Sequence, residues 1–184
     1  MAKNTVGRLS FNVAFCGIIS AISVITMFGS LIPSLAYVVP AIAGIFIWTI
    51  GEQINIKWAV LSYITVAILS FMLVPELEAN FFFISLFGYY PTLCEKIKRI
   101  NKKSLQYVVK LLIFNISAVL TYKILCFILS ATQLLEGMES FGQWAPYVLW
   151  GMGLVAFILY DLVLETYKGI YIKGVKPKFK KLMK

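Results

Sequence analysis

The sequence contains no histidine and only three cysteines, and both facts narrow the function before any motif is considered. Without histidine, a histidine-ligated metal site and a catalytic triad with an imidazole base are excluded. Cys16, Cys94 and Cys126 lie singly in separate apolar stretches, a spacing that argues against a disulfide framework. The sequence also lacks a phosphate-binding glycine loop, so we do not expect the chain itself to hydrolyse ATP.

Charged residues are scarce, because they make up 14% of the chain while apolar residues make up 60%. A soluble domain is typically about 25% charged. Hydrophobic stretches of about 18 or more residues recur along the chain, and each is long enough to cross a bilayer core of about 30 Å as a helix. The composition therefore predicts an all-α, polytopic integral membrane protein with a single membrane domain over residues 1–184.

Six transmembrane segments are predicted. They cover residues 9–28, 31–50, 58–74, 81–93, 105–130 and 144–166, and a basic tail follows at residues 167–184. Pro33 and Pro40 predict a broken outer half of the second segment, because proline removes a helix hydrogen bond. The fourth segment is short and contains Gly88 and Pro91. If it were re-entrant, the topology after it would invert.

Positive charge is confined to one side of this predicted topology. Of the 17 lysines and arginines, all but Lys110 and Lys123 fall at the amino terminus, at Lys57, in the loop EKIKRINKK and in the tail. The positive-inside rule then predicts that both termini lie in the cytoplasm, with the protein in the plasma membrane. The basic loop and tail are juxtamembrane, so their expected partners are anionic lipids, or alternatively a cytoplasmic protein, and not nucleic acid.

Lys123 lies within the otherwise apolar stretch LTYKILCFIL, about 10 Å short of the outer end of the fifth segment. Its side chain either extends to the outer headgroups or faces the interior of the bundle, where charges usually serve function. Helical spacing places Asn115 near the same stripe, with Thr121 beside it. No predicted outer loop contains a basic residue, so Lys123 is the one fixed cation offered to an anion approaching from outside.

Two further pairs of residues are singled out by their positions in the predicted segments. Lys110 and Asp161 lie at about the same depth near the cytoplasmic boundary, which predicts a structural ion pair with Glu165 as a possible third member. In the first segment Gly17 and Ala21 have small-xxx-small spacing, so another helix can approach closely there. This strip is either an internal packing seam or a docking face for another membrane protein.

The architecture and three sequence stretches resemble the substrate-binding S component of an energy-coupling factor (ECF) transporter. The stretches are CGIISAIS, IPSLAYVVPAIAGIF and KWAVLSYITVAILSFMLVP, and they cover much of the first 75 residues. The family motif is usually alanine-xxx-alanine, and Gly17 with Ala21 is the nearest match here. FFFISLFGYYP is also similar to small uncharacterised membrane proteins of Gram-positive bacteria.

The resemblance implies a non-catalytic protein, without a cofactor, that binds a vitamin or other micronutrient at the outer end of its bundle. It also implies association with an ECF transmembrane subunit and two cytoplasmic ATPases. Lys123 would pair with a carboxylate or phosphate of the ligand, helped by Asn115 or Thr121. The ligand would also stack on three tyrosines, Tyr37, Tyr89 and Tyr90.

Three other functions remain open at this point. A scaffold or accessory subunit of an envelope complex would use the same helices for packing alone. A membrane enzyme acting on lipid has only Asp161 and Glu165 as interior carboxylates and lacks an obvious acid and base pair. An ion channel would need a ring of repeated polar residues, which the sequence does not show.

Overall fold

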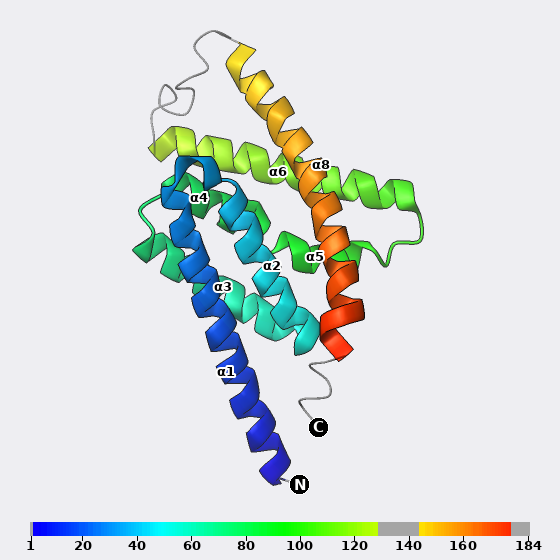
Figure 1. The fold of residues 1–184 in the computed structure, drawn as a ribbon. Coiled ribbons are helices and arrows are strands. Elements are labelled where there is room, and N and C mark those ends of the chain that lie inside the picture. Colours follow the sequence, from blue (N-terminus) through cyan, green and yellow to red (C-terminus); the bar gives the residue numbers. More distant parts are fainter. Residues whose placement is uncertain (1, 129–143, 178–184) are drawn as a thin grey trace. The chain divides into compact units, whose positions relative to one another are not determined.

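The computed structural model describes residues 2–128 and 144–177, which form helices and turns without any strand (Figure 1). The α-helices are α1 (Ala2–Met27), α2 (Val38–Gln53), α3 (Ile56–Leu73), α4 (Leu77–Phe82), α5 (Tyr90–Ile97), α6 (Lys103–Ile128) and α8 (Ala145–Ile170). The chain divides into two compact units, Met1–Thr121 and Tyr122–Lys184, and the division falls within α6. The all-helical fold class is therefore confirmed for the described residues.

Within residues 2–128 and 144–177, four segments are long and apolar enough to cross a membrane. They are Gly7–Leu31, Ile56–Leu73, Lys103–Ile128 and Tyr147–Gly174, and α2 is a shorter apolar helix of 16 residues. These helices indicate a membrane protein. The predicted end of the fifth segment at residues 129–130 and the acidic loop residues Glu136 and Glu139 lie outside the described part.

The second segment begins later than predicted, at Val38 and not at residue 31. Two 3-10 turns, Phe28–Leu31 and Pro33–Leu35, come before it. Ile32 between them is extended, with φ −88° and ψ 112°, because the ring of a following proline disfavours the helical conformation. The predicted break is therefore present before α2, at Pro33, whereas Pro40 lies in the first turn of α2.

The fourth and sixth segments are longer than predicted. The fourth covers Leu77–Ile97 as α4, a π-helical turn (Phe83–Phe87) and α5, whereas the prediction gave residues 81–93. The sixth runs through Ile170 and continues as a π-helical turn, Tyr171–Val175, so the first part of the predicted tail is helical. No proline interrupts residues 147–176, so nothing in the backbone ends the helix at residue 166.

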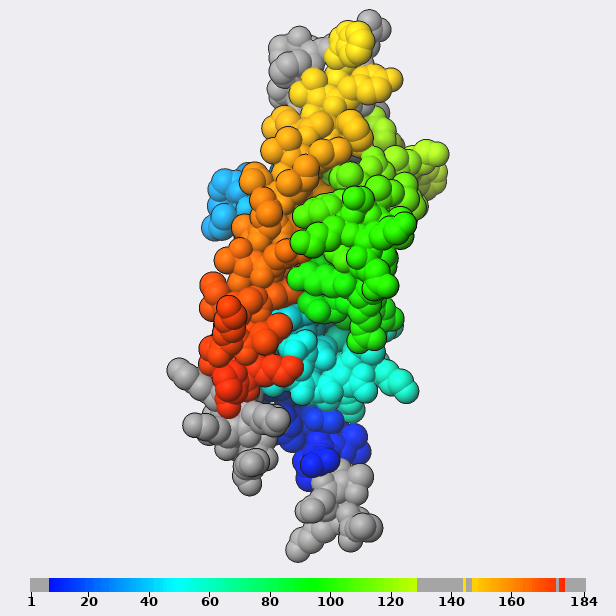
Figure 2. All heavy atoms as spheres, turned by 90° about the vertical axis from the view of Figure 1, so that its right-hand side faces the viewer, coloured from blue at the N-terminus to red at the C-terminus, as the bar shows by residue number. Residues whose placement is uncertain are grey.

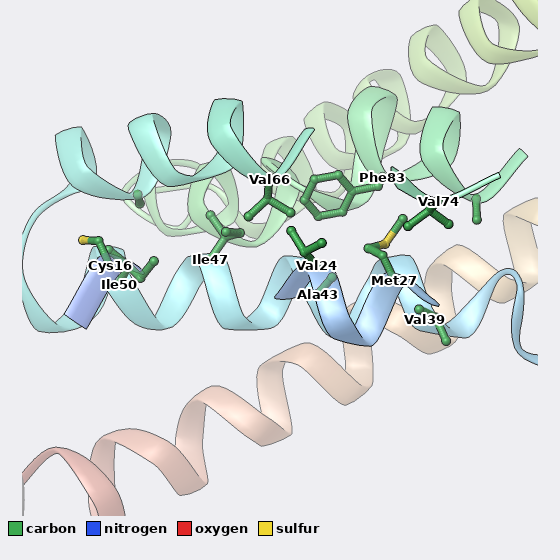
Figure 3. Close-up of a cluster of buried hydrophobic side chains, with 12 residues drawn as sticks. Cys16, Val24, Met27, Val39, Ala43, Ile47, Ile50, Val66, Val74 and Phe83 are labelled. Atoms are coloured by element: carbon green, nitrogen blue, oxygen red, sulfur yellow. The ribbon is translucent and has the colours of Figure 1, made fainter. Parts of the chain in front are cut away.

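The core of the first unit lies where α1, α2 and α3 meet. Figure 3 shows Cys16 of α1 beside Ile50 of α2, and Val24 of α1 near Ala43 of α2, while Met27 of α1 and Ile47 of α2 belong to the same cluster. Val66 of α3, Val74 directly after α3 and Phe83 of the π-helical turn belong to the same cluster. Lipid tails are as apolar as these side chains, so close packing and interhelical hydrogen bonds must hold the bundle together.

The fourth segment runs antiparallel to α3 over the length of that helix. At one end the Phe71 and Phe81 rings lie 6.0 Å apart, and the Asn80 side-chain amide donates to the Val74 carbonyl at 2.8 Å. Further along, the Tyr63 and Tyr89 rings lie 6.2 Å apart. The segment therefore begins beside the end of α3 and proceeds back toward its start.

Two glycines allow the irregular part of this segment to lie against its neighbours. A β-carbon at Gly44 of α2 would overlap the carbonyl oxygen of Phe87 and lie 2.8 Å from its carbonyl carbon. A β-carbon at Gly88 would lie 2.5 Å from Cε2 of the Tyr63 ring. Any larger residue at Gly44 must displace backbone, which is stiffer than a side chain.

The π-helical turn has a backbone hydrogen bond between residues five apart, and a side chain of α3 adds a bond to one of its carbonyls. The Gly88 N–H donates to the Phe83 carbonyl at 2.8 Å, and the Tyr63 hydroxyl donates to the Ile84 carbonyl at 2.6 Å. An unpaired backbone group in an apolar environment costs several kcal/mol, roughly. Tyr63 thus stabilises the turn as well as packing against it.

α1 is longer than the helices it packs against. Figure 2 shows its first turns, in blue, extending beyond the cyan connection between α2 and α3. Leu9 and Val13 in this part are 56% and 54% exposed. The amino-terminal turns therefore present apolar side chains away from the first unit.

We predict that Gly44→Ala lowers the thermal stability of the purified protein in detergent micelles. Overpacking of this kind costs about 1–3 kcal/mol, and here the β-carbon meets backbone. Gly17→Ala is the matched control, because nothing lies within 4 Å of its β-carbon position and alanine favours a helix by up to about 1 kcal/mol. Equal melting temperatures for Gly44→Ala and the unmodified protein would contradict the close approach.

Candidate functional site

A polar seam joins the fourth segment to α6. It consists of two hydroxyl–hydroxyl bonds: Thr121 Oγ1 donates to Ser85 Oγ at 2.6 Å, and Tyr89 Oη lies 2.9 Å from Ser117 Oγ. Ser117 and Thr121 are 4% and 3% exposed. Each partner pair is four residues apart on its own segment, so the two bonds lie one above the other. The seam holds two helices together inside an apolar bundle.

The seam includes two of the predicted ligand residues. Tyr89 and Thr121 are brought to the same interface, but their hydroxyls bind Ser117 and Ser85 there. Buried hydroxyls need such partners, because an unpaired polar group in an apolar environment is costly. Both residues therefore have a structural role in the described geometry.

Tyr37 and Tyr90, the other predicted ligand tyrosines, differ in exposure. Tyr37 precedes α2, is 55% exposed, and its hydroxyl donates to a carboxylate oxygen of Glu78 at 3.0 Å. Its ring meets the Phe82 ring edge-on at 5.4 Å. Tyr90 is fully buried at the start of α5. Along the helix axis Phe82 and Tyr89 are about 10 Å apart, so Tyr37 and Tyr89 belong to different levels of the bundle.

The electrostatics around Tyr37 favour its neutral form. Partial burial and the neighbouring carboxylates of Glu78 and Glu76 raise the pKa of Tyr37 to about 12, and the hydrogen bond to Glu78 acts in the same direction. A tyrosinate beside carboxylates would suffer like-charge repulsion. Tyr37 is therefore a hydrogen-bond donor at physiological pH.

Lys123 is exposed and lies on a different face of α6 from the polar seam. Two residues correspond to about 200° around a helix, so Lys123 points almost opposite to Thr121. Eight residues correspond to about 80°, so Asn115 lies on the same side as Lys123. The Asn115 amide donates to the Leu111 carbonyl at 2.8 Å. The predicted stripe is thus split, with Asn115 and Lys123 on one side and Thr121 on the other.

The predicted ion pair of Lys110 and Asp161 stays a prediction, because the two residues belong to different units. Both side chains are buried, and the Lys110 ammonium lies 5.7 Å from the centre of the Tyr107 ring. An ammonium over an aromatic face is attracted by the ring quadrupole. Glu165 is exposed on α8.

The small residues of α1 divide between two faces. Cys16, Ser20 and Ser23 are buried against the bundle, whereas Gly17 and Ala21 are exposed. The exposed pair extends toward the amino terminus as a stripe of small residues with spacing of three and four, which we call the α1 face. Its members are Gly7, Ser10, Ala14, Gly17 and Ala21, all exposed. Neither Gly7 nor Gly17 has an atom within 4 Å of its β-carbon position.

A pocket of about 130 Å³ lies among α2, α3 and α5. Its lining includes Tyr63, Tyr89, Thr92 and Lys96, and Tyr89 is its only predicted ligand residue. Ile56 and Ala59 from the first turn of α3 also line it, so the pocket lies at the end where α2 connects to α3. This is the end predicted to be cytoplasmic.

The sequence reasoning missed several residues that the structure connects. Ser85 and Ser117 complete the polar seam, Tyr63 supports the π-helical turn, and Thr92 with Lys96 lines the pocket. A signal for the seam was present, because Ser85–Tyr89 and Ser117–Thr121 are both polar pairs at four-residue spacing. Comparison with protein-family models, curated proteins and solved structures found no match to this chain.

We predict that Tyr37 titrates near pH 12 and not near its ordinary value of 10.0. The folded state holds this proton more tightly than the unfolded state. The stabilisation is therefore complete below pH 10 and is lost as the pH rises through about 12. The difference in tyrosinate absorbance between the unmodified protein and Tyr37→Phe would report the titration. Glu78→Gln should lower the pKa, and a midpoint near 10 in the unmodified protein would refute the contact.

Proposed function

We propose that this protein is the non-catalytic, substrate-binding subunit of an ECF-type importer in the plasma membrane, and that it captures a small anionic micronutrient at the outer face. The observation that carries this proposal is the exposed α1 face. Five small residues at spacings of three and four form a flat surface on a helix that is long and apolar enough to cross a bilayer. Such surfaces allow the backbones of two transmembrane helices to approach closely.

The exposure of the α1 face favours a partner over internal packing. Cys16, Ser20 and Ser23 already supply the internal side of α1, and Gly17 and Ala21 are left outside it. Lipid tails gain little from a flat surface, whereas a second helix gains dispersion contacts along the whole stripe. In the ECF architecture this partner is the transmembrane subunit, which in turn binds two cytoplasmic ATPases.

A topology of six crossings with both termini in the cytoplasm is part of the proposal. It is supported by the fourth segment, which proceeds from the end of α3 back toward its start. Residues 77–97 are 21 residues, and at the rise of an α-helix they would extend at most about 31 Å, close to the thickness of a bilayer core. A re-entrant segment would return to the side from which it entered. The distribution of lysine and arginine supports the same orientation.

Within this proposal Lys123 is the residue that pairs with the anionic group of the ligand. Asn115 is on the same side of α6 and is the residue placed to assist it, whereas Thr121, Tyr89 and Tyr90 hold the bundle. The discontinuous fourth segment fits a transport subunit, because broken helices recur at the binding sites of transporters. Tyr37, exposed at the start of α2, remains available to cap a ligand.

A scaffold or accessory subunit of an envelope complex is the second candidate. It is favoured by the polar seam, in which the interior hydroxyls of Ser85, Tyr89, Ser117 and Thr121 bind one another. A seam of this kind needs no ligand. A scaffold would use the α1 face as well, but its partners would be envelope proteins and not ATPases.

We predict that the tagged protein, purified from its own host, brings with it a transmembrane subunit and two ATPases. Gly17→Leu and Ala21→Leu should abolish this association, because leucine side chains would separate the helix backbones. Folding should be unchanged, since both positions are exposed. Gly169→Leu on α8 is the control, because its surroundings are equally open. Recovery of envelope proteins without ATPases would reject the importer and support the scaffold.

Lys123→Met is predicted to weaken ligand binding about ten-fold or more. Hydrogen bonds to charged groups contribute about 1.5–3 kcal/mol, and about 1.4 kcal/mol corresponds to a factor of ten. The measurement is uptake of candidate micronutrients at limiting concentration, with the melting temperature as a check on folding. Lys57→Met, which removes another exposed lysine, serves as the control. Unchanged uptake in Lys123→Met would show that Lys123 only extends to the headgroups.

A further inference from the structure

The pocket of the first unit combines an apolar interior with a cationic rim. Ile47 of α2, Ala59 and Val60 of α3, and Leu93 of α5 form its apolar walls, together with the Tyr63 ring. Among the described residues that line the pocket, Lys96 alone is charged, and it is exposed. The apolar walls suit hydrocarbon, while the rim suits an anion, so the pocket matches an amphiphile better than a uniformly polar solute.

Two polar residues of the pocket lining lie on one face of α5. Thr92 and Lys96 are four residues apart on α5, so they lie on one face of the helix with about 6 Å between them. Gly88, in the turn before α5, is buried, whereas Lys96 is exposed next to the basic loop that connects α5 to α6. The hydroxyl of Thr92 is buried and has no hydrogen-bond partner among the described residues. A buried hydroxyl without a partner costs free energy, so a bound group that accepts a hydrogen bond from it would be favoured.

We propose that this pocket binds one anionic phospholipid. The lipid phosphate pairs with the Lys96 ammonium, an ester carbonyl accepts a hydrogen bond from the Thr92 hydroxyl, and the upper part of one acyl chain lies against Val60 and Tyr63. In a glycerophospholipid the phosphate and the first ester carbonyl are separated by the glycerol unit. This separation is comparable to the one helical turn between Lys96 and Thr92.

The surroundings of the pocket support a lipid as its occupant. Val60 is 49% exposed and Ile64, one turn further along α3, is 46% exposed, so the apolar wall continues onto the surface of a helix apolar enough to cross a membrane. The remainder of an acyl chain can follow this surface into the bilayer. A small polar solute would gain nothing from it.

Charge at this end of the unit favours an anionic headgroup. Near the pocket the chain carries six cations, Lys57, Lys96, Lys98, Arg99, Lys102 and Lys103, against two carboxylates, Glu52 and Glu95. Each basic residue near a membrane surface contributes about 1 kcal/mol of attraction to anionic lipid. That general attraction would hold a diffuse layer of lipids. The pocket adds a defined position for one of them, and this position depends on Lys96 and Thr92 in particular.

The test is native mass spectrometry of the full-length protein in detergent micelles, titrated with phosphatidylglycerol or with phosphatidylcholine of the same acyl chains. We expect one phosphatidylglycerol to bind more tightly than phosphatidylcholine. Lys96→Gln should weaken phosphatidylglycerol binding about five-fold, which corresponds to roughly 1 kcal/mol. Lys98→Gln, an exposed lysine outside the lining, should leave it nearly unchanged. Thr92→Val should weaken both lipids by a similar factor, because both contain the ester.

Two further variants test whether a loss of binding is caused by the pocket itself or by a loss of folding. Val60→Trp fills the pocket from its exposed rim and should abolish the single tight site, while Leu61→Trp, an exposed neighbour outside the lining, should retain it. Equal effects of Lys96→Gln and Lys98→Gln, or retained binding in Val60→Trp, would overturn the proposal. Competition by glycerol phosphate that depends on Lys96 would also overturn it, because the site would then recognise a free phosphate. None of these outcomes depends on whether the protein belongs to an importer.

Discussion

The contact between the Gly44 backbone and the Phe87 carbonyl is the constraint on which the first unit depends. It allows an irregular segment to lie inside an apolar bundle, where water is not available to pair with freed backbone groups. In this turn the Gly88 N–H donates to the Phe83 carbonyl, and the Tyr63 hydroxyl adds a hydrogen bond to the Ile84 carbonyl. Glycine at position 44 thus determines how close α2 and the fourth segment can be, and the positions of Tyr89, Thr92 and Lys96 follow from it.

The polar residues of the membrane helices serve separate purposes. Hydroxyls of the fourth segment and α6 pair with each other in the polar seam and hold the helices together. Lys96 and Lys123 instead lie exposed. In an apolar solvent this division is expected, because a buried polar group must have a partner while an exposed charge must reach the interface.

The helical fold class and the long apolar segments could be predicted from composition and hydrophobic length alone. The irregular start of the second segment followed from Pro33, because the effect of proline on the preceding residue is local. The extent of the fourth segment could not be predicted, because Gly88 and Pro91 suggest an end to the helix, and only the contacts with α2 and α3 preserve it. Helical geometry alone predicts that Thr121 and Lys123, two residues apart, lie on nearly opposite sides of α6. The four-residue spacing of Ser85 with Tyr89 and of Ser117 with Thr121 was visible in the sequence, but that these two pairs bind each other depends on tertiary packing.

The π-helical turn has a consequence for the whole of α5. A π-helical turn contains one residue more than the α-helical turn it replaces, and each added residue rotates everything after it by about 100°. This one additional residue sets the rotation of α5 about its own axis. It therefore decides which side chains of α5 face α2 and α3. The number of residues in the turn Phe83–Phe87 therefore cannot change without changing the face that α5 presents. A homologue that lost a residue there would present a different side of α5 to the bundle, even if every side chain downstream were identical.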